Sequence, residues 1–404
     1  MNCSQSSEIP TSKRVLDWIV EGLLIFLFFI TPLIREGIRI ITLLLTIFWL
    51  IKKIKYREIP EEKIIYVELY KWVGILGLGF ILSFINVINI SSAFKKFADE
   101  YVLLALIFLI SLDVIRNKKQ LKRLFYTAII SATIAGLSGL HQHLFEGYTR
   151  IKSTLRGAND AGTYFTSIAL LGFAYLLFKN KLKHLEFVAA SLFTLLSLAC
   201  VFYAGSRGAW LSLFGGFISL LFFAVKNKRF IDYKKVIVVF VILVLAATFI
   251  DLGWVFERLN SITDLSNNSN LERIWMIQGG LEMLKDHPLV GVGIGQFEEV
   301  YLDYKREAAG SFTHLHCLFL HLAVEIGIIG FLIFSILAYK VIKTGLKGSL
   351  ATGKEHWYHY GVIGVLIGTA VHNLFEWSFL YVQVGSFTMI LLATWLNKTN
   401  AVDE

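Results

Sequence analysis

Charged residues and cysteines are scarce in this sequence. Only 17% of its 404 residues are charged, against about 25% in soluble domains, and this shortage excludes a soluble multidomain enzyme. The three cysteines, Cys3, Cys200 and Cys317, are odd in number and far apart, and no CxxC pair is present. This pattern argues against a disulfide framework and against a cysteine zinc site, so we expect small buried apolar side chains.

Apolar residues dominate instead, at 56% of the chain. They form runs of about 20 residues, the length that crosses a bilayer as a helix, separated by short clusters of Lys, Arg and Gly. We therefore predict an all-α polytopic membrane protein in which residues 1–404 form one integral membrane domain with about twelve transmembrane helices, the first retained and not cleaved. The predicted spans are 15–34, 37–51, 70–90, 101–115, 124–144, 161–178, 185–204, 208–225, 235–255, 314–342, 357–376 and 378–396.

The net charge of +9 would suit nucleic acid, but the positions of the basic residues indicate membrane topology instead. With the N-terminus placed in the cytoplasm, the cytoplasmic segments hold 25 of the 39 basic residues, the opposite side holds 13, and Lys71 lies within a span. Short basic cytoplasmic loops are what the positive-inside rule requires. We expect membrane lipids around the protein and no nucleic-acid partner.

One long loop, residues 256–313, separates the predicted ninth and tenth spans on the outer, periplasmic side. Ser269 and Glu272 have the spacing of a helix capping box, which predicts an amphipathic helix from Leu271 to near Asp286. Its apolar residues at helical spacing are Ile274, Ile277, Leu281 and Leu284. Such a helix would either lie on the membrane surface or cap a cavity between the spans.

Three arginines are predicted at one level, the outer membrane boundary. Arg156 precedes a span, Arg207 occupies a tight turn between two spans, and Arg273 begins the loop helix. A guanidinium grips phosphate through two parallel hydrogen bonds and stays charged, and a helix N-terminus adds to the anion preference at Arg273. These residues are candidates for phosphate binding. The alternative is that they contact lipid headgroups or end their helices.

His314 and His316 lie where the long loop re-enters the membrane. On a helix they would point about 200° apart, so both can line one site only if this segment is not yet helical. His316 is the better candidate for a general base, since the pKa of imidazole lies near ambient pH, and on a continuous helix Gly327 and Gly330 would share its face. The alternative is an interfacial histidine bonded to a loop carbonyl.

Other polar residues lie near the outer ends of late spans. His321 and Glu325, spaced i and i+4, are expected to pair inside the helix bundle. His372, Asn373 and Glu376 either line a cavity or bond neighbouring helices.

Metal and cofactor motifs are absent from the sequence. There is no Asp-x-Asp and no HExxH, and the GVGIGQ stretch follows a helix and a proline without a preceding strand, which argues against a dinucleotide fingerprint. We predict a metal-independent site that uses no cofactor.

The chain resembles the bacterial O-antigen ligases, which share a superfamily with O-antigen polymerases, most closely over residues 200–332. That family carries an arginine in a turn before a span, matched by Arg207, and another at the start of the loop helix, matched by Arg273. Its most specific motif is a histidine, then Asn, Ser or Gln, then nine residues and Gly-x-x-Gly-Thr-Trp. His316, Gly327 and Gly330 fit this spacing, whereas Cys317, Phe331 and Leu332 depart from it.

The resemblance implies a glycosyltransferase of the bacterial inner membrane with its active site facing the periplasm. Such an enzyme transfers a glycan from undecaprenyl diphosphate to a sugar hydroxyl of lipid A-core, completing lipopolysaccharide. On this basis we expect Arg207 and Arg273, with Arg156, to bind the diphosphate and stabilise its growing charge. His316 would deprotonate the acceptor for inverting attack, with His314 among the substrate-binding residues.

Two other functions remain open from the sequence. An O-antigen polymerase uses the same kind of donor with a second lipid-linked glycan as acceptor. A polysaccharide or lipid transporter is less favoured, because that class shows repeats, broken helices or ionisable residues at mid-membrane. Here the polar residues gather at one membrane face.

Overall fold

The computed structural model describes residues 11–56, 64–179, 181–226, 268–306, 312–351 and 356–400, together with Gly310 and isolated positions between 237 and 260. All regular structure in these residues is helical. The helices are α1 (Thr11–Ile30), α2 (Arg35–Tyr56), α3 (Ile64–Leu82), η1 (Ser83–Asn86), α4 (Ile90–Lys96), η2 (Phe97–Val102), α5 (Leu103–Val114), α6 (Lys118–Leu144), α7 (Ala158–Phe178), α8 (His184–Tyr203), α9 (Arg207–Lys226), α12 (Asn268–Asp286), α13 (Phe297–Tyr304), α14 (Leu318–Ala351), α15 (His356–His372), η4 (Ser378–Leu380) and α16 (Val382–Asn400).

The predicted class, an all-α polytopic membrane protein, is confirmed. Six helical segments in the described residues are long and apolar enough to cross a membrane: Val67–Asn86, Lys118–Leu144, Ala158–Phe178, His184–Tyr203, Arg207–Lys226 and Leu318–Lys347. Helices also lie at the other predicted spans, apart from 235–255, which falls almost entirely outside the described residues. The count of about twelve spans stays a prediction.

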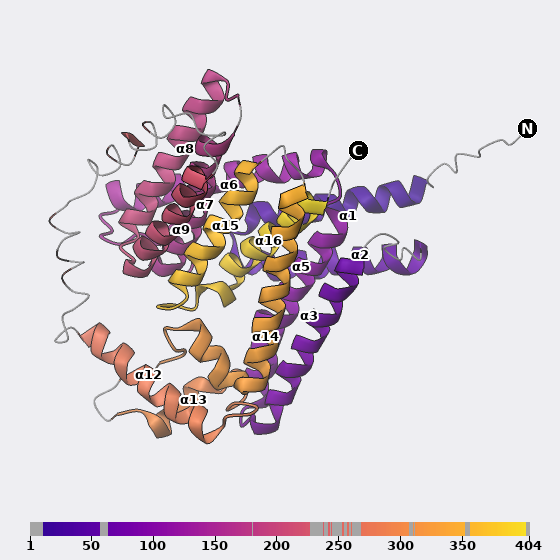
Figure 1. Ribbon diagram of the computed structural model, residues 1–404. Coiled ribbons are helices and arrows are strands. Elements are labelled where there is room, and N and C mark those ends of the chain that lie inside the picture. Colours follow the sequence, from indigo (N-terminus) through magenta and orange to yellow (C-terminus); the bar gives the residue numbers. More distant parts are fainter. Residues whose placement is uncertain are drawn as a thin grey trace, which may run out of the picture.

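The α7 helix is the centre of one half of the bundle and packs against α8, α9 and α15 (Figure 1). Most of its side chains are buried, and small residues lie where it crosses its neighbours. A Cβ added to Gly162 would stand 2.7 Å from the Cβ of Ala209 in α9. Between helices in lipid, association depends on this kind of close backbone approach.

The other half of the bundle is built from α3, α5, α14 and α16. Figure 1 shows α14 running beside α3, and these two helices are in contact. Gly79 of α3 faces Gly330 of α14, since a Cβ on Gly79 would lie 3.4 Å from the Cα of Gly330. The second glycine of the His-x₁₀-Gly-x-x-Gly spacing therefore serves a helix crossing.

The predicted span 314–342 corresponds to α14, which differs from the prediction in its start and in its regularity. Helix α14 begins only at Leu318, and its regular geometry breaks at Gly327, which has φ 69° and ψ 177°. A side chain on Gly327 would collide with the carbonyl of Leu289, because the loop after α12 inserts at this point. The alignment of His316 and Gly327 on one helical face therefore does not exist.

The loop satisfies the backbone groups that the break in α14 exposes. The amides of Ile328 and Ile329 donate to the carbonyls of Pro288 and Leu289, at 2.8 and 3.2 Å. On the other side of the break, the amide of Val292 donates to Val324 at 2.9 Å. An unpaired backbone group in a membrane costs several kcal/mol, so this exchange of partners is what makes the break tolerable.

The predicted loop helix is confirmed as α12, which ends at Asp286 and starts three residues earlier than predicted. With α13 it lies across one end of the bundle (Figure 1). Met276 and Met283 are buried toward α13 and the start of α14, whereas Ile274, Ile277 and Leu281 are 39%, 41% and 53% exposed. Three of the four residues of the predicted apolar row therefore face outward, whereas Leu284 packs against the same buried cluster as Met276 and Met283.

Candidate functional site

A polar cavity of about 250 Å³ opens at the end of the bundle where α7 begins and α15 ends. Three stretches of chain line it, around residues 150–160, 314–316 and 376–381. The lining residues are Arg150, Arg156, Gly157, Ala158, Asn159, Asp160, His314, His316, Glu376 and Tyr381. Two arginines, two histidines and two carboxylic acids thus face one small volume.

His314 and His316 lie in a non-helical segment just before α14. Residues two apart in an extended chain point to the same side, which brings both imidazoles into the cavity. Leu315 points the other way and is fully buried, with its amide 3.5 Å from Nδ1 of His321. The sequence predicted that both histidines could line one site only if this segment were not helical. The segment is not helical, and both histidines line the cavity.

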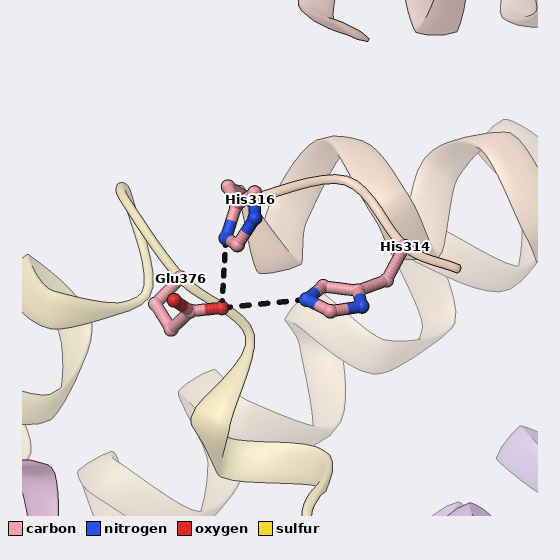
Figure 2. Close-up of side chains that lie close together, drawn as sticks. All are labelled: His314, His316 and Glu376. Carbon is pink, nitrogen blue, oxygen red and sulfur yellow. Dashed lines mark hydrogen bonds and ion pairs between the residues drawn. The ribbon is translucent and has the colours of Figure 1, made fainter. Parts of the chain in front are cut away.

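Glu376 joins the two histidines, as Figure 2 shows. Its Oε1 lies 3.0 Å from Nδ1 of His316 and 3.5 Å from Nε2 of His314. Its other oxygen accepts a hydrogen bond from Asn159 at the start of α7. The carboxyl group is only 4% exposed, so a single buried acid connects α7, the loop after α15 and the segment before α14.

The local environment makes Glu376 an anion and His314 neutral. Burial alone would raise the pKa of Glu376, but hydrogen bonding and charge interaction with the two imidazoles hold this pKa well below its ordinary value. Burial lowers the pKa of His314, because an imidazolium is poorly solvated there. An ionised carboxylate only accepts hydrogen bonds, so Nδ1 of His316 carries the proton it shares with Glu376.

The indole ring of Trp377 packs against His314 and His321. The ring of His314 stacks on it at 4.7 Å and 17°, and His321 meets it edge-on at 4.6 Å. The Nζ of Lys96 lies 4.1 Å from the same ring, a cation–π contact. His321 and Glu325 approach to 3.6 Å with both side chains buried, so the predicted pair is present. Through the contact of His321 with Trp377, this pair packs against the site.

Two arginines border the cavity. Arg156 lies over the ring of Tyr381 at 4.4 Å, and Arg150 donates to the side-chain oxygen of Asn159 at 3.2 Å. Their loop is anchored by Gln142 at the end of α6, whose amide group binds both the N–H and the carbonyl of Ser153. Two guanidinium groups held at an open rim favour an anionic ligand.

Arg207 and Arg273 lie outside the lining of this cavity, on its α12 side. Arg207 donates to the side chain of Asn270 at 3.0 Å and so ties the start of α9 to α12. Arg273 lies near His372 of α15, and His372 in turn is hydrogen-bonded to Thr163 of α7. The structure therefore brings Arg156, His314 and His316 together and places the other two arginines at the adjoining helix contact.

His314, His316 and Glu376 also have the chemistry of a metal-ligand group, with one donor atom from each within 4.8 Å of the others. Two imidazoles and a carboxylate suit zinc. The same cavity is lined by two guanidinium groups, and their positive charge opposes the entry of a cation. The sequence motifs missed this group because 60 residues separate its histidine and carboxylate members; metal independence stays a prediction.

The most important residue that the sequence left unassigned is Glu376. The sequence placed it among polar residues near the end of a late span, but it did not predict which residue Glu376 contacts. No sequence pattern pointed to three further lining residues, Asn159, Asp160 and Tyr381, because each lies at the end of an apolar helix and belongs to no motif. They are recognised as site residues only because they line the same cavity.

Residues 192–335 match a family model described as O-Antigen ligase. The match runs from α8 into α14 and contains Arg207, Arg273, His314 and His316, whereas Arg156 and Glu376 lie outside it. No curated protein matches the sequence.

Proposed function

We propose that this chain, which belongs to the O-antigen ligase family through its residues 192–335, transfers a glycan from undecaprenyl diphosphate to a sugar hydroxyl of lipid A-core at the periplasmic face of the bacterial inner membrane. The observation that supports this most is the 3.0 Å contact of His316 with Glu376 in a cavity bordered by Arg150 and Arg156. The donor already carries its leaving group, so the reaction needs a base and cations but no ATP.

His316 acts as the general base. Since its Nδ1 donates to the Glu376 carboxylate, its Nε2 has the lone pair that takes the acceptor's proton. The carboxylate stabilises the imidazolium formed in that step and fixes the ring's orientation, as in other carboxylate–histidine pairs. Glu376 is itself held by Asn159, which keeps the pair in register with α7.

The arginines bind the diphosphate. Arg150 and Arg156 contact it from the rim of the cavity, and Arg207 and Arg273 reach it from the α9–α12 side. Negative charge grows on the diphosphate oxygen as the glycosidic bond breaks, and guanidinium groups already in place stabilise that charge without reorganisation. His314, neutral and stacked on Trp377, contacts the sugar.

The reaction is a single displacement with inversion. The acceptor oxygen attacks the anomeric carbon while its proton moves to Nε2 of His316. The bond from that carbon to the diphosphate oxygen breaks, and undecaprenyl diphosphate leaves with the electron pair. The imidazolium then returns its proton to solvent through the open cavity.

The test is transfer by purified protein in lipid nanodiscs supplied with lipid-linked glycan and lipid A-core. His316→Ala should lower the rate by about 100-fold or more, since general base catalysis contributes about 10²–10⁴. His184→Ala, an exposed histidine at the start of α8, is the matched control and should transfer at the wild-type rate. Equal rates for the two variants would remove His316 from the mechanism.

The same assay distinguishes a ligase from a polymerase. A ligase attaches glycan to lipid A-core and leaves the donor's glycan length unchanged when the acceptor is omitted. Growth of the lipid-linked glycan without lipid A-core would instead assign polymerase activity to the same site.

A further inference from the structure

A second, apolar cavity of about 290 Å³ lies within the bundle among α3, α5, α14, α15 and α16. Aliphatic and aromatic side chains line nearly all of it, for example Leu76, Phe108 and Leu337. In the described part of the chain Glu100 is the one charged residue in the lining, and it pairs with Lys96 at 2.7 Å. This carboxylate is already paired, so the cavity suits a hydrocarbon chain and has no cation in its lining to bind an anionic headgroup.

The lining of the apolar cavity adjoins that of the polar cavity at two points in the sequence. Leu318 lines the apolar cavity and follows His316 of the polar one by two residues. Leu380 lines the apolar cavity and directly precedes Tyr381 of the polar one. The amide of Leu318 also donates to the carbonyls of Asn373 and Glu376, at 2.9 and 3.2 Å, so the two linings are tied together by backbone hydrogen bonds.

Adjoining polar and apolar cavities fit an amphiphile whose charged group joins its hydrocarbon chain directly. We propose that the apolar cavity binds the first isoprenoid units of the donor's polyprenyl chain while the diphosphate lies in the polar cavity. This inference rests on the proposed function and adds to it the place of the donor's lipid.

The acceptor's acyl chains fit this place less well. In the donor, the bond that breaks is on the diphosphate, and the diphosphate is attached to the chain itself, so the chain must begin next to the reacting atoms. In lipid A-core the reacting hydroxyl is on a sugar, and further sugars separate it from the acyl chains. An apolar cavity that begins two residues from His316 therefore matches the donor's chain.

The apolar cavity would contribute to the reaction by positioning the donor more than by raising the affinity for it. A polyprenyl chain that enters from the bilayer leaves one apolar environment for another, so burial in itself adds little. A defined path for the chain does fix the diphosphate, and a displacement of about 1 Å at the reacting centre can cost about 100-fold in rate. Blocking the cavity should therefore lower the efficiency of transfer from a long-chain donor.

The first test fills the cavity with Ala338→Trp, which places an indole in its α14 wall. We expect kcat/KM for the undecaprenyl donor to fall at least about ten-fold, while the value for the same glycan diphosphate on a single isoprenoid unit and the KM for lipid A-core stay unchanged. Leu332→Trp is the control on the same helix, since Leu332 is 54% exposed and outside the lining. Ala105→Phe fills the cavity from α5 if the first variant does not fold.

An undiminished kcat/KM for the long-chain donor in a folded cavity variant would overturn the inference and leave the proposed function standing. Absence of any transfer by the wild-type protein would instead contradict the proposed function. A rise in the KM for lipid A-core alone would assign the cavity to the acceptor.

Photo-crosslinking tests the same inference without turnover. An undecaprenyl diphosphate glycan with a diazirine on its first isoprenoid unit should label the α14 segment 334–342 and the α5 segment 104–108, and unlabelled donor should compete. A lipid A-core probe with a diazirine on an acyl chain should not label these segments. Labelling of the outer surface of α14 by the donor probe, or of these segments by the acceptor probe alone, would overturn the inference.

Discussion

Glu376 is the residue on which the geometry of the candidate site depends. Its two oxygens contact side chains from opposite directions, Asn159 on one and the two histidines on the other. A carboxylate in this position does more than neutralise charge, because it selects which nitrogen of His316 carries the proton. Substitution of Glu376 therefore tests the orientation and protonation of His316 while His316 itself stays in place.

Glu376→Gln should lower the rate of transfer by about 100-fold or more in a protein that still inserts and folds. The amide oxygen of the new side chain continues to accept from Asn159, so its NH₂ group faces His316. A donor in that position forces Nδ1 to accept, and the proton then occupies Nε2, where the base needs a lone pair. The rate is measured with saturating donor and acceptor in nanodiscs.

Glu298→Gln is the matched control, because Glu298 is an exposed acid on α13 outside the cavity lining. It should transfer at the wild-type rate. A Glu376→Gln variant with near-normal kcat would show that Glu376 is only a structural link between α7 and α14.

The pKa of Glu376 predicts how its contribution to stability depends on pH. Because the folded-state pKa lies below the ordinary value of 4.5, the carboxylate stabilises the folded protein fully above that value. The stabilisation is lost as pH falls from 4.5 through the lower folded-state pKa. The difference in unfolding temperature between wild type and Glu376→Gln should shrink as pH falls below about 4.5. A difference that does not depend on pH in that acidic range would contradict the ionised state.

Metal independence is the last prediction at the scale of single residues. Treatment with EDTA followed by desalting should leave transfer unchanged, because the guanidinium groups of Arg150 and Arg156 supply the positive charge that a metal would otherwise provide. The measurement is the transfer rate before and after treatment. Loss of activity that zinc restores would show that His314, His316 and Glu376 act as metal ligands.

At the scale of elements, the start of α14 at Leu318 shapes the site. If residues 314–317 were part of the helix, the two histidines would point about 200° apart. The later break at Gly327 receives a loop. The GVGIGQ stretch, which resembles a phosphate loop only in its spacing, instead inserts its backbone at the break. Gly291, Gly293 and Gly295 all have positive φ, which lets the loop turn tightly between α3 and α14.

Gly327→Ala should destabilise the folded protein by about 2–5 kcal/mol, since a Cβ at positive φ costs about 1–2 kcal/mol and collision with Leu289 adds an overpacking cost of about 1–3 kcal/mol. Thermal unfolding in detergent measures this as a lower midpoint. Gly74→Ala in α3 is the control, because no atom lies within 4 Å of its added Cβ. It should be neutral or slightly stabilising. An unchanged midpoint in Gly327→Ala would show that α14 can straighten.

At the scale of the whole molecule, residues from distant parts of the chain converge at one end of the bundle. The turn between α8 and α9 binds the loop after α6, with the amide of Ile151 2.9 Å from the carbonyl of Tyr203. The loop after α15 binds α7 and the start of α14, and α12 covers the same end (Figure 1). The arginines predicted at one level do share this end, as the alternation of spans requires.

The basic residues predict the orientation of this end in the membrane. Glu146→Cys, in the loop after α6, should react with a membrane-impermeant maleimide in intact spheroplasts. Lys119→Cys, at the start of α6, should react only after permeabilisation, because the predicted spans place 25 of the 39 basic residues on its side, which the positive-inside rule assigns to the cytoplasm. The background is a chain with Cys3 and Cys317 replaced by alanine. Reversed labelling would place the candidate site in the cytoplasm.

The class of the protein, most helix positions and the candidate residues Arg156, His314 and His316 were predictable from sequence, because hydrophobic run length and charge placement are local properties that a bilayer imposes directly. The helix α12 and its end at Asp286 follow from local spacing in the same way. The partner of His316 was not predictable. It depends on how α15 ends and where the following loop packs against α7, and no local pattern encodes a contact across 60 residues.

The break at Gly327 likewise depends on a loop inserted from elsewhere in the chain. The sequence by itself thus determined that this protein lies in a membrane and at which face its polar residues gather. Only the tertiary structure decided which of them meet, because side-chain contacts between distant segments are set by packing.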